Sequence, residues 1–508
     1  MSGTTAAAVK LRSASAPSRH VYDVAVIGSQ MGGALAAALL ARRGYQVLYV
    51  DHDGLGPGYG HEGWLLPYAP FVMAPLRSLP PLEEAAAELG LTQVLQRAIR
   101  AVPKIQLVRP NERIDLFRQS PDTGRLPIEI ERALGKERVA GFLSSIGTLA
   151  TQKFRPDLRG YPDLPPDGFF SRRRFNSLAK KMESQGGGSP LKLEPDTQLL
   201  GEFGKFVTYS EADGFARGFP LAGVLEEPYT IDGGRHGLRE LFLTRLKELG
   251  GDVLAHDETT VVEQLGFDGS KVSGIKLVRG DTLYRTGVVI GATDAGAMRR
   301  LVSDKKKHRE LTEVLDGANT KQVLFTVNWV LPEKAIPRGM GELLLMQTAT
   351  DDQPDLSNAT LVQVSHARRL GGESAAEDRV VSASAFAPAS ARELGEEHLT
   401  SLMEKLSRRL EELMPFSRKQ VKAISAPYLH ASGVRGSRLL PHPLLSFEEE
   451  SPLSICGLPL RLPVKNLFLA SREVLPGLGL EGEFRAGARV AELVHEAMGK
   501  TDPLRRAR

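Results

Sequence analysis

Residues 22–51 read YDVAVIGSQMGGALAAALLARRGYQVLYVD, which is the pattern of a strand, a tight turn, a helix and a second strand that ends at an acid. The run 23–27 is short, apolar and rich in β-branched residues, as a strand covered on both faces requires, and it stops at Gly28. The helix opens with Gly32 and Gly33 and continues through small alanines. This stretch therefore predicts a βαβ unit within a parallel sheet.

Units of this kind often hold a dinucleotide, because the helix N-terminus offers backbone N–H groups to a pyrophosphate and glycines let the backbone approach it. The G-x-G-x-x-G pattern falls on Gly28, Gln30 and Gly33, so its middle position carries a long polar side chain. Asp51 follows the second strand, where a carboxylate can accept the hydroxyls of an adenosine ribose. We predict a dinucleotide site here; a βαβ unit kept for structure alone is the alternative.

The composition is that of a globular protein of two or three domains: 508 residues, 42% hydrophobic and 25% charged. Residues 1–20 are polar and lack the apolar core of a signal peptide, so we expect a disordered lead. No apolar run is long enough for a membrane helix. The single cysteine, Cys456, suits a reducing compartment, and we expect a cytoplasmic protein.

The net charge of +4 is small for this length and indicates no nucleic-acid partner. Two local basic runs, 172–174 and 305–309, leave peripheral contact with a membrane open, although such runs are more often solvated faces. Oligomeric state has no signal in the sequence.

Strand and helix signals like those of the first unit return late in the chain. The Gly233-Gly234 pair precedes a predicted helix, 238–249, and the predicted strands are 252–255, 260–265, 272–277, 282–285 and 288–292. Near the C-terminus a strand at 466–470, a glycine-punctuated loop and a helix at 484–498 follow. The predicted fold class is α/β, with a Rossmann-like domain of the FAD/NAD(P)-binding, glutathione reductase type built from discontinuous segments 21–75, 227–301 and 455–500.

The remaining segments, 76–226 and 302–454, predict an α+β substrate or cap domain. Helical spacing occurs within 76–100 and 127–151. A Pro-, Gly- and Arg-rich passage follows at 154–190, in which 186–190 (GGGSP) marks a loop. Its aromatics Phe169, Phe170 and Phe175 are expected in core packing, with an apolar pocket as the alternative. A half-buried antiparallel sheet with one helix completes the domain, from strands 322–330, 343–347, 360–366 and 380–387 and helix 397–414.

These pieces, in this order, resemble the FAD-dependent phytoene desaturase-like and amine oxidase-like flavoproteins, over roughly residues 21–74, 227–301 and 464–499. The C-terminal family pattern NLYLxGDxxxPGxGxxG is matched from Asn466 to Gly482. The resemblance implies a flavin fold, a hydrophobic small-molecule substrate such as an isoprenoid, a carotenoid or a lipid, and hydride transfer between that substrate and the flavin. It also implies these cofactor-binding residues: Gly28, Ser29, Gln30, Gly32, Gly33, Asp51, Val261, Ala292, Arg472, Gly479 and Leu480.

Two positions depart from the family pattern. Ser471-Arg472 stands where the family has Gly-Asp, and Gln30 stands where it has the middle glycine of the first turn. Other members of this fold have given up the flavin and act as lipid- or prenyl-binding chaperones, the Rab GDI-like proteins among them. Three functions stay open: an FAD-dependent desaturase-like oxidoreductase, a flavin-free module that binds a lipid, a prenyl group or a protein, and an oxidase of amines or amino acids.

Side chains suited to proton transfer near a flavin are few. His61 and His236 are weak candidates, and Glu481 lies at the start of the last helix, whose N-terminal dipole would face the flavin. A hydrogen-bonded or surface histidine is the more common use of each. The histidines show no metal-ligand spacing, and no nucleophile elbow or Walker loop is present, so we expect no metal site.

Overall fold

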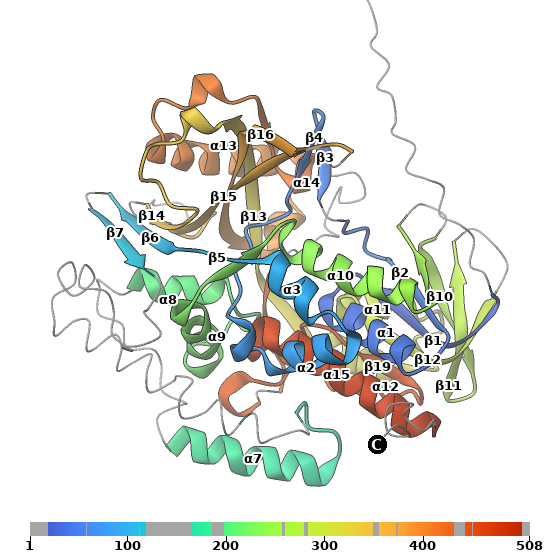
Figure 1. Cartoon of the computed structure of the whole chain (residues 1–508). Helices are drawn as coiled ribbons and strands as arrows, with labels where there is room; N and C mark the ends of the chain where they lie inside the picture. The colour runs from blue at the N-terminus through green and yellow to red at the C-terminus, as the bar shows by residue number, and fades with distance from the viewer. Residues whose placement is uncertain are drawn as a thin grey trace, which may run out of the picture.

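The computed structural model describes residues 19–56, 58–110, 112–117, 158, 164–184, 198–256, 260–278, 283–348, 355–371, 374–430, 442–449 and 451–499. The predicted N-terminal lead, apart from its last two residues, and the predicted helix within 127–151 lie outside these ranges. The predicted α/β class is confirmed: the structure carries two large sheets, and the first has the parallel pairings of a Rossmann-like fold (Figure 1).

The first sheet has seven strands in the order β10-β11-β12-β1-β2-β9, with β19 also paired to β12. Four of its pairings are parallel: β1 with β2, β1 with β12, β2 with β9 and β12 with β19. The hairpin partners β10 and β11 are antiparallel and extend one edge. The strands are β1 (Val21–Gly28), β2 (Val47–Val50), β9 (Asp252–Leu254), β10 (Val262–Asp268), β11 (Lys271–Leu277), β12 (Leu283–Ala292) and β19 (Leu467–Leu469).

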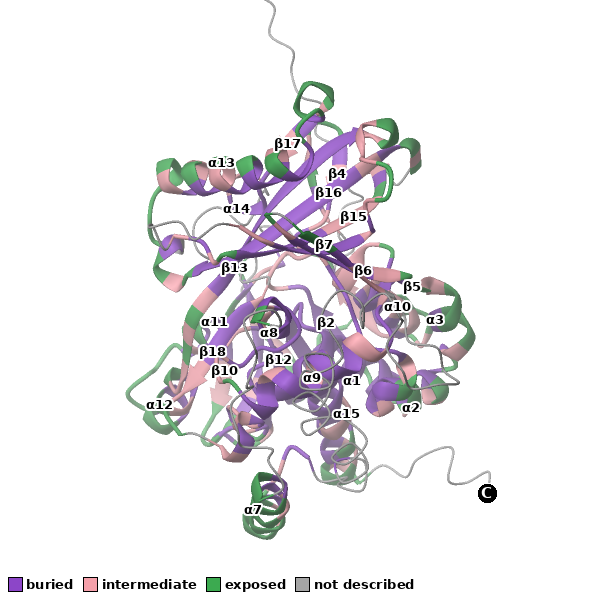
Figure 2. Cartoon of the chain, turned by 90° about the vertical axis from the view of Figure 1, so that its left-hand side faces the viewer, coloured by how far each residue is buried: buried purple, intermediate pink, exposed green. Residues whose placement is uncertain are grey.

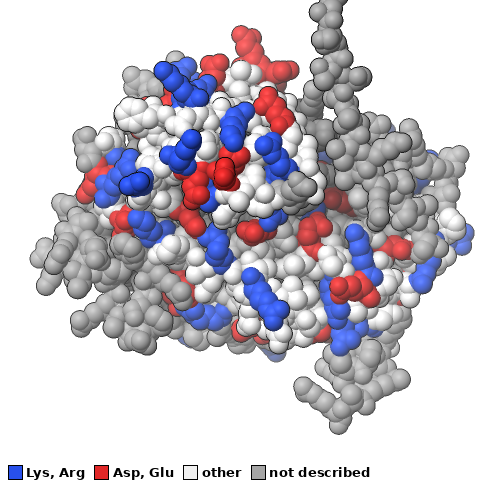
Figure 3. All heavy atoms as spheres, turned by 45° about the horizontal axis from the view of Figure 1, so that its top comes forward, with Lys and Arg blue, Asp and Glu red and all other residues white. Residues whose placement is uncertain are grey.

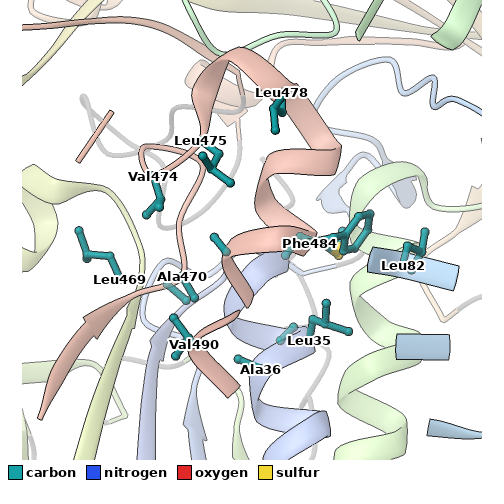
Figure 4. Close-up of a cluster of buried hydrophobic side chains, with 14 of the residues drawn as sticks. Leu35, Ala36, Leu82, Leu469, Ala470, Val474, Leu475, Leu478, Phe484 and Val490 are labelled. Atoms are coloured by element: carbon teal, nitrogen blue, oxygen red, sulfur yellow. The ribbon is translucent and has the colours of Figure 1, made fainter. Parts of the chain in front are cut away.

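Helix α1 (Met31–Arg42) is buried from Met31 to Ala41 because its small side chains allow other elements to approach on every side. It contacts α10 (Gly234–Glu248) and α15 (Gly479–Met498), and α2 (Pro80–Leu89) packs against both α1 and α15. A Cβ on Gly487 would lie 2.3 Å from the carbonyl oxygen of Gly32, so α1 and α15 cross in near backbone contact. Figure 4 shows the apolar cluster at this crossing, where Leu35 and Ala36 of α1 lie near Phe484 and Val490 of α15.

The second sheet has ten strands and is mostly antiparallel, with the main order β17-β13-β16-β15-β14-β6-β7. Helix α13 (Glu396–Leu413) covers it with leucines at helical spacing, which form a second apolar core around Trp329. The strands are β3 (Tyr59–His61), β4 (Trp64–Leu66), β6 (Lys104–Arg109), β7 (Glu112–Phe117), β13 (Ala318–Pro332), β14 (Leu343–Gln347), β15 (Ala359–Arg369), β16 (Ser374–Pro388), β17 (Ala423–Ser425) and β18 (Pro443–Phe447).

Shorter elements join the two sheets. Strand β5 pairs with β8, and the helices α8 and α9 contact each other below the second sheet (Figure 1). Strand interiors and α1 are buried in Figure 2, whereas α7 stands at the margin and is largely exposed. The bounds are α3 (Thr92–Ala98), β5 (Ile99–Ala101), α7 (Phe169–Ser184), α8 (Gln198–Lys205), α9 (Phe215–Glu226), β8 (Tyr229–Ile231), α11 (Ala295–Arg300), α12 (Arg309–Asp316) and α14 (Pro427–His430), with six short 3₁₀ turns η1 to η6.

Three predictions about local structure were wrong. The predicted strands 282–285 and 288–292 form the single strand β12, because its first half pairs with β11 and its second half with β19. The last helix begins at Gly479 rather than at 484, and the helix predicted from 238 begins at Gly234. The passage 154–190, to which the sequence analysis assigns only a loop at 186–190, contains α7, whose buried Phe175, Ala179 and Met182 recur at helical spacing.

No helix among the described residues combines the length and the apolar character that a membrane crossing requires.

Candidate functional site

The predicted nucleotide crevice lies where β1 and β12 end and α1 begins. Gly28 has φ of +126°, and a Cβ there would lie 2.1 Å from the carbonyl oxygen of Ala292. The Gln30 backbone N–H donates to that same oxygen at 2.9 Å. A Cβ on Gly33 would lie 2.1 Å from the Ala292 Cβ. These glycines are therefore required by contacts within the chain, whether or not a ligand also approaches them.

The N-terminus of α1 is occupied by a carboxylate from α15. The backbone N–H of Met31 donates to Oε2 of Glu483 at 3.2 Å, and the Glu483 side chain is fully buried. Arg235, from the first turn of α10, forms a charged hydrogen-bonded pair with the same carboxylate and also donates to the Tyr209 hydroxyl. Burial raises the pKa of Glu483, but the Arg235 charge and hydrogen bond outweigh it, and the net shift is downward. A buried anion thus sits where a pyrophosphate would bind.

Gln30 fills the turn between β1 and α1. Its Nε2 donates to Oδ1 of Asp294 at 3.2 Å, and its Oε1 accepts the backbone N–H of Arg472 at 2.8 Å. The Arg472 guanidinium closes the triangle with an ion pair to Asp294 at 2.9 Å. Gln30 and Arg472 are each 5% exposed. The two residues that depart from the family pattern, 442 positions apart, are therefore direct partners.

A second carboxylate ties the neighbouring loops together. Asp53 accepts the backbone N–H of Ser29 at 2.8 Å, the Ser29 hydroxyl at 3.0 Å and the Thr293 hydroxyl at 2.6 Å. Glu473, next to Arg472, accepts the N–H of Ala295 at 2.7 Å, and burial shifts its pKa upward. Donors that face a phosphate in a nucleotide site are here paired with the chain's own acids.

Asp51 lies at the end of β2, where a ribose carboxylate is expected, and is buried with Arg239 of α10. The two side chains form an ion pair at 3.3 Å, and Arg239 also donates to the Ser29 carbonyl at 3.1 Å. Burial raises the pKa of Asp51 to about 6, although the Arg239 charge opposes the rise. The other carboxylate oxygen, Oδ1, is buried and has no hydrogen-bond partner among the described residues. A ribose hydroxyl bound at this position would donate to this oxygen.

One pocket among the described residues, lined from the second sheet and from the starts of α10 and α15, is small. It has a volume of about 70 Å³ and is lined by Phe71, Tyr209, Arg235, His236, His442 and Leu480, among others. An engineered protein cavity of roughly 150 Å³ accepts a single benzene ring. A flavin has three fused rings, so this pocket does not fit one as it stands.

The start of α15, which the sequence placed against a flavin, is covered by the segment after α8. A Cβ on Gly479, at φ of +55°, would lie 2.0 Å from the Val207 carbonyl oxygen. The backbone N–H of Tyr209 and the hydroxyl of Thr208 both donate to the Pro476 carbonyl, at 3.1 and 3.2 Å. Leu480 lines the small pocket. The residues present at the pyrophosphate and ring positions therefore do not fit bound FAD in this arrangement.

The three weak catalytic candidates lie in three different elements. His61 is in β3, at the edge of the second sheet, and its ring is 4.3 Å from the ring of His430. Glu481 is buried in α15 and paired with Arg485 at 2.8 Å. His236 lines the small pocket, and burial, followed by the charges of Arg239, Arg235 and Arg472, lowers its pKa well below the usual value.

The remaining predicted cofactor residue, Val261, accepts the N–H of Val278 at the start of β10. Nothing in the described part of the chain groups three or more His, Cys, Asp or Glu side chains as a metal site would.

Sequence reasoning missed the residues that occupy the crevice: Arg235, Arg239, Asp53, Asp294 and Glu483. All five are charged, and most of them lie inside segments that the sequence analysis interprets as apolar or glycine-rich. A charged side chain that is buried in such a segment requires a partner of opposite charge, and this requirement could have predicted ion pairs in the crevice.

Comparison with solved structures supports the fold. The chain resembles an oxidoreductase from Methanosarcina mazei, with a TM-score of 0.51, 14% identity and coverage of 94% of this chain and 100% of the other. It also resembles cyclohexylamine oxidase from Brevibacterium oxydans (TM-score 0.52, 14% identity, 94% and 99%). Putrescine oxidase bound to putrescine is a third (TM-score 0.53, 14% identity, 94% and 99%). At this identity the likeness establishes the fold alone.

No protein-family model matches the chain, and no curated protein matches it in sequence. The broad resemblance to FAD-dependent oxidoreductases is supported at the level of fold, and the narrower resemblance to phytoene desaturases stays a prediction.

Proposed function

We propose that this chain keeps the fold of the FAD-dependent oxidoreductases but works without the flavin, as a module that binds an apolar ligand. The observation that carries this proposal is the buried Glu483 carboxylate at the N-terminus of α1. A pyrophosphate placed there would meet a carboxylate whose pKa is already held down by Arg235, so two anions would share one set of donors.

The two departures from the family pattern support the same proposal. Gln30 and Arg472 bond to each other and to Asp294, and together they fill the turn that a nucleotide needs open. Removing one of them would leave buried polar groups without partners, which is unfavourable. The network is therefore consistent with a crevice that has become part of the core.

The ligand site in this proposal is the cavity beneath α7, which we call the α7 cavity. Its volume is about 570 Å³, within the range of roughly 300–1,000 Å³ usual for small-molecule sites. Phe175, Phe447, Leu458, Leu460 and Val474 supply apolar lining. Charged side chains also line it, namely Arg172, Glu313, Glu448 and Glu449.

An absorbance spectrum tests the flavin-free part. The protein is purified without added cofactor, measured across the near-ultraviolet and visible range, and measured again after incubation with FAD and desalting. We expect no flavin bands in either sample. Stoichiometric flavin bands in either one overturn the proposal.

The ligand part is tested by organic extraction of the purified protein followed by mass spectrometry, and by titration with a fluorescent polyene fatty acid. Asn176→Trp places a large side chain on the lining of the α7 cavity from an exposed position. Ser177→Trp is the matched control, because Ser177 is the next residue of α7, is exposed and is not part of the lining. We expect the first substitution to weaken fatty-acid binding and the second to leave it unchanged; equal effects contradict this site.

An FAD-dependent oxidoreductase acting on an apolar substrate, or on an amine, is the second candidate. The observation that favours it is the unpartnered, buried Oδ1 of Asp51 at the ribose position. This candidate requires Glu483 and Gln30 to leave the positions they occupy, and a flavin spectrum would establish it. In that case the bound flavin would supply the hydride acceptor, and this chain would supply the pocket and the ribose contact.

A further inference from the structure

The first turn of α7 exposes two adjacent aromatic side chains. Phe169 is 73% exposed and Phe170 is 78% exposed, and their rings pack edge to face with centroids 5.6 Å apart. Figures 1 and 2, two views at right angles, both place α7 at the margin of the molecule. Two neighbouring exposed phenylalanines on a helix whose other face packs on the protein indicate a contact surface.

The same helix concentrates positive charge. Residues 169–184 contain three arginines, two lysines and one glutamate, a net charge of 5 − 1 = +4. The whole chain of 508 residues also has a net charge of +4, so the other residues sum to zero. The face seen in Figure 3, by contrast, mixes both signs. Arg172 and Arg173 follow the phenylalanine pair after one residue, Ser171, and are exposed.

Helix α7 is held in place from its other side. Phe175, Ala179 and Met182 are buried, and the helix contacts η5 (Pro452–Ser454). Just before the helix, Asp167 pairs with Arg461 at 2.6 Å. The phenylalanine pair is therefore presented outward by an anchored helix, so that exposing it does not depend on unfolding part of the core.

We propose that the first turn of α7 docks this protein on an anionic lipid bilayer. Phe169 and Phe170 enter the boundary between headgroups and acyl chains, and Arg172 and Arg173 lie among the lipid phosphates. Aromatic side chains favour that boundary, and cationic side chains next to it are attracted to anionic headgroups. The proposal does not rest on the absence of a flavin, because α7 lies outside the nucleotide crevice.

Vesicle co-sedimentation tests the proposal with the full chain. The probe is a set of phosphatidylcholine vesicles containing about 30% phosphatidylserine, compared with pure phosphatidylcholine vesicles. We expect binding to the first set, little binding to the second, and a decrease with added salt because the arginine contribution is screened.

Matched variants identify the surface. Phe169→Ser with Phe170→Ser is expected to weaken binding at least about tenfold, and Arg172→Ser with Arg173→Ser about tenfold or more. Phe416→Ser is the aromatic control, since Phe416 is 89% exposed on another part of the protein. Replacing the exposed basic run Lys305, Lys306 and Lys307 by serine is the charge control.

Both controls are expected to bind vesicles like the unmodified protein. Circular dichroism confirms that each variant is folded before binding is compared. Absence of binding to the anionic vesicles overturns the proposal, and a protein partner would then be the alternative for this surface. Equal loss in the α7 variants and their controls also overturns it. Neither outcome bears on the flavin spectrum, so this proposal and the flavin-free part of the proposed function fail independently.

Discussion

Replacing Glu483 by glutamine tests the buried ion pair that fills the crevice. Glutamine keeps an acceptor for the Met31 N–H but removes the charge, so the Arg235 guanidinium loses its counter-ion. Breaking a buried ion pair usually costs about 3–5 kcal/mol. The Arg235 side chain is still 17% exposed, which lets water offset part of the loss, so we expect about 3 kcal/mol.

The assay is guanidinium chloride unfolding at neutral pH, followed by circular dichroism. A domain of ordinary stability has roughly 5–15 kcal/mol to lose, so a change of about 3 kcal/mol moves the midpoint clearly. Glu492→Gln is the matched control, because Glu492 lies on the same helix in an ion pair with Arg489 and its side chain is 49% exposed. We expect the control to cost less than about 0.5 kcal/mol.

A double substitution separates the ion pair from the packing. Glu483→Leu with Arg235→Met replaces the charges by apolar side chains of similar size, and such replacements are often neutral. We expect the double variant to be more stable than either single variant. If Glu483→Gln costs no more than Glu492→Gln, the pair does not stabilise the crevice and the reasoning is refuted.

Three other substitutions give separate tests. Gln30→Ala removes the amide that joins Asp294 to Arg472. We expect the free energy of unfolding to fall by about 2 kcal/mol in the same assay, and we expect the variant to bind no flavin. An unchanged unfolding midpoint would contradict the network. Asp51→Asn tests the pH dependence: burial lifts the Asp51 pKa to about 6, so the native state binds the extra proton and stability falls as pH rises from about 4 to 6. We expect the variant to lose this portion of the slope when unfolding is measured across that range, whereas parallel profiles would show that the carboxylate is not perturbed. Gly487→Ala forces a Cβ within 2.3 Å of the Gly32 carbonyl oxygen, so we expect a lower melting temperature and a loss of about 1–3 kcal/mol in the free energy of unfolding. Gly296→Ala is the control, because its new Cβ would lie 3.9 Å from the nearest neighbouring atom, and we expect it to be close to neutral. Equal effects of the two substitutions would refute close packing of α1 on α15.

The regular elements of the fold could be predicted because their signals are local. The apolar run before Gly28, the alanine-rich helix and the leucine spacing of α13 each carry their own periodicity, and all of them appear in the structure. Helix α7 was missed because glycine and proline flank it, and its polar face outweighed the three buried residues Phe175, Ala179 and Met182.

The state of the crevice could not be predicted from local patterns. Glu483 and Met31 are 452 positions apart, and the backbone contact of Gly479 with Val207 joins two segments that have no pattern in common. The sequence did single out Gln30 and Arg472 as departures, but each was considered separately as a change at a pyrophosphate. Their hydrogen bond to each other depends on how the two distant loops meet.

Equilibrium dialysis of the purified protein against excess FAD tests the central claim most directly, because it counts the nucleotide bound per chain without assuming a reaction. With the Glu483 carboxylate at the start of α1 and about 70 Å³ in the pocket that Leu480 lines, we expect no more FAD on the protein side than in the buffer. Retention of one FAD per chain would contradict the account and would show that Glu483 and Gln30 move aside for the nucleotide.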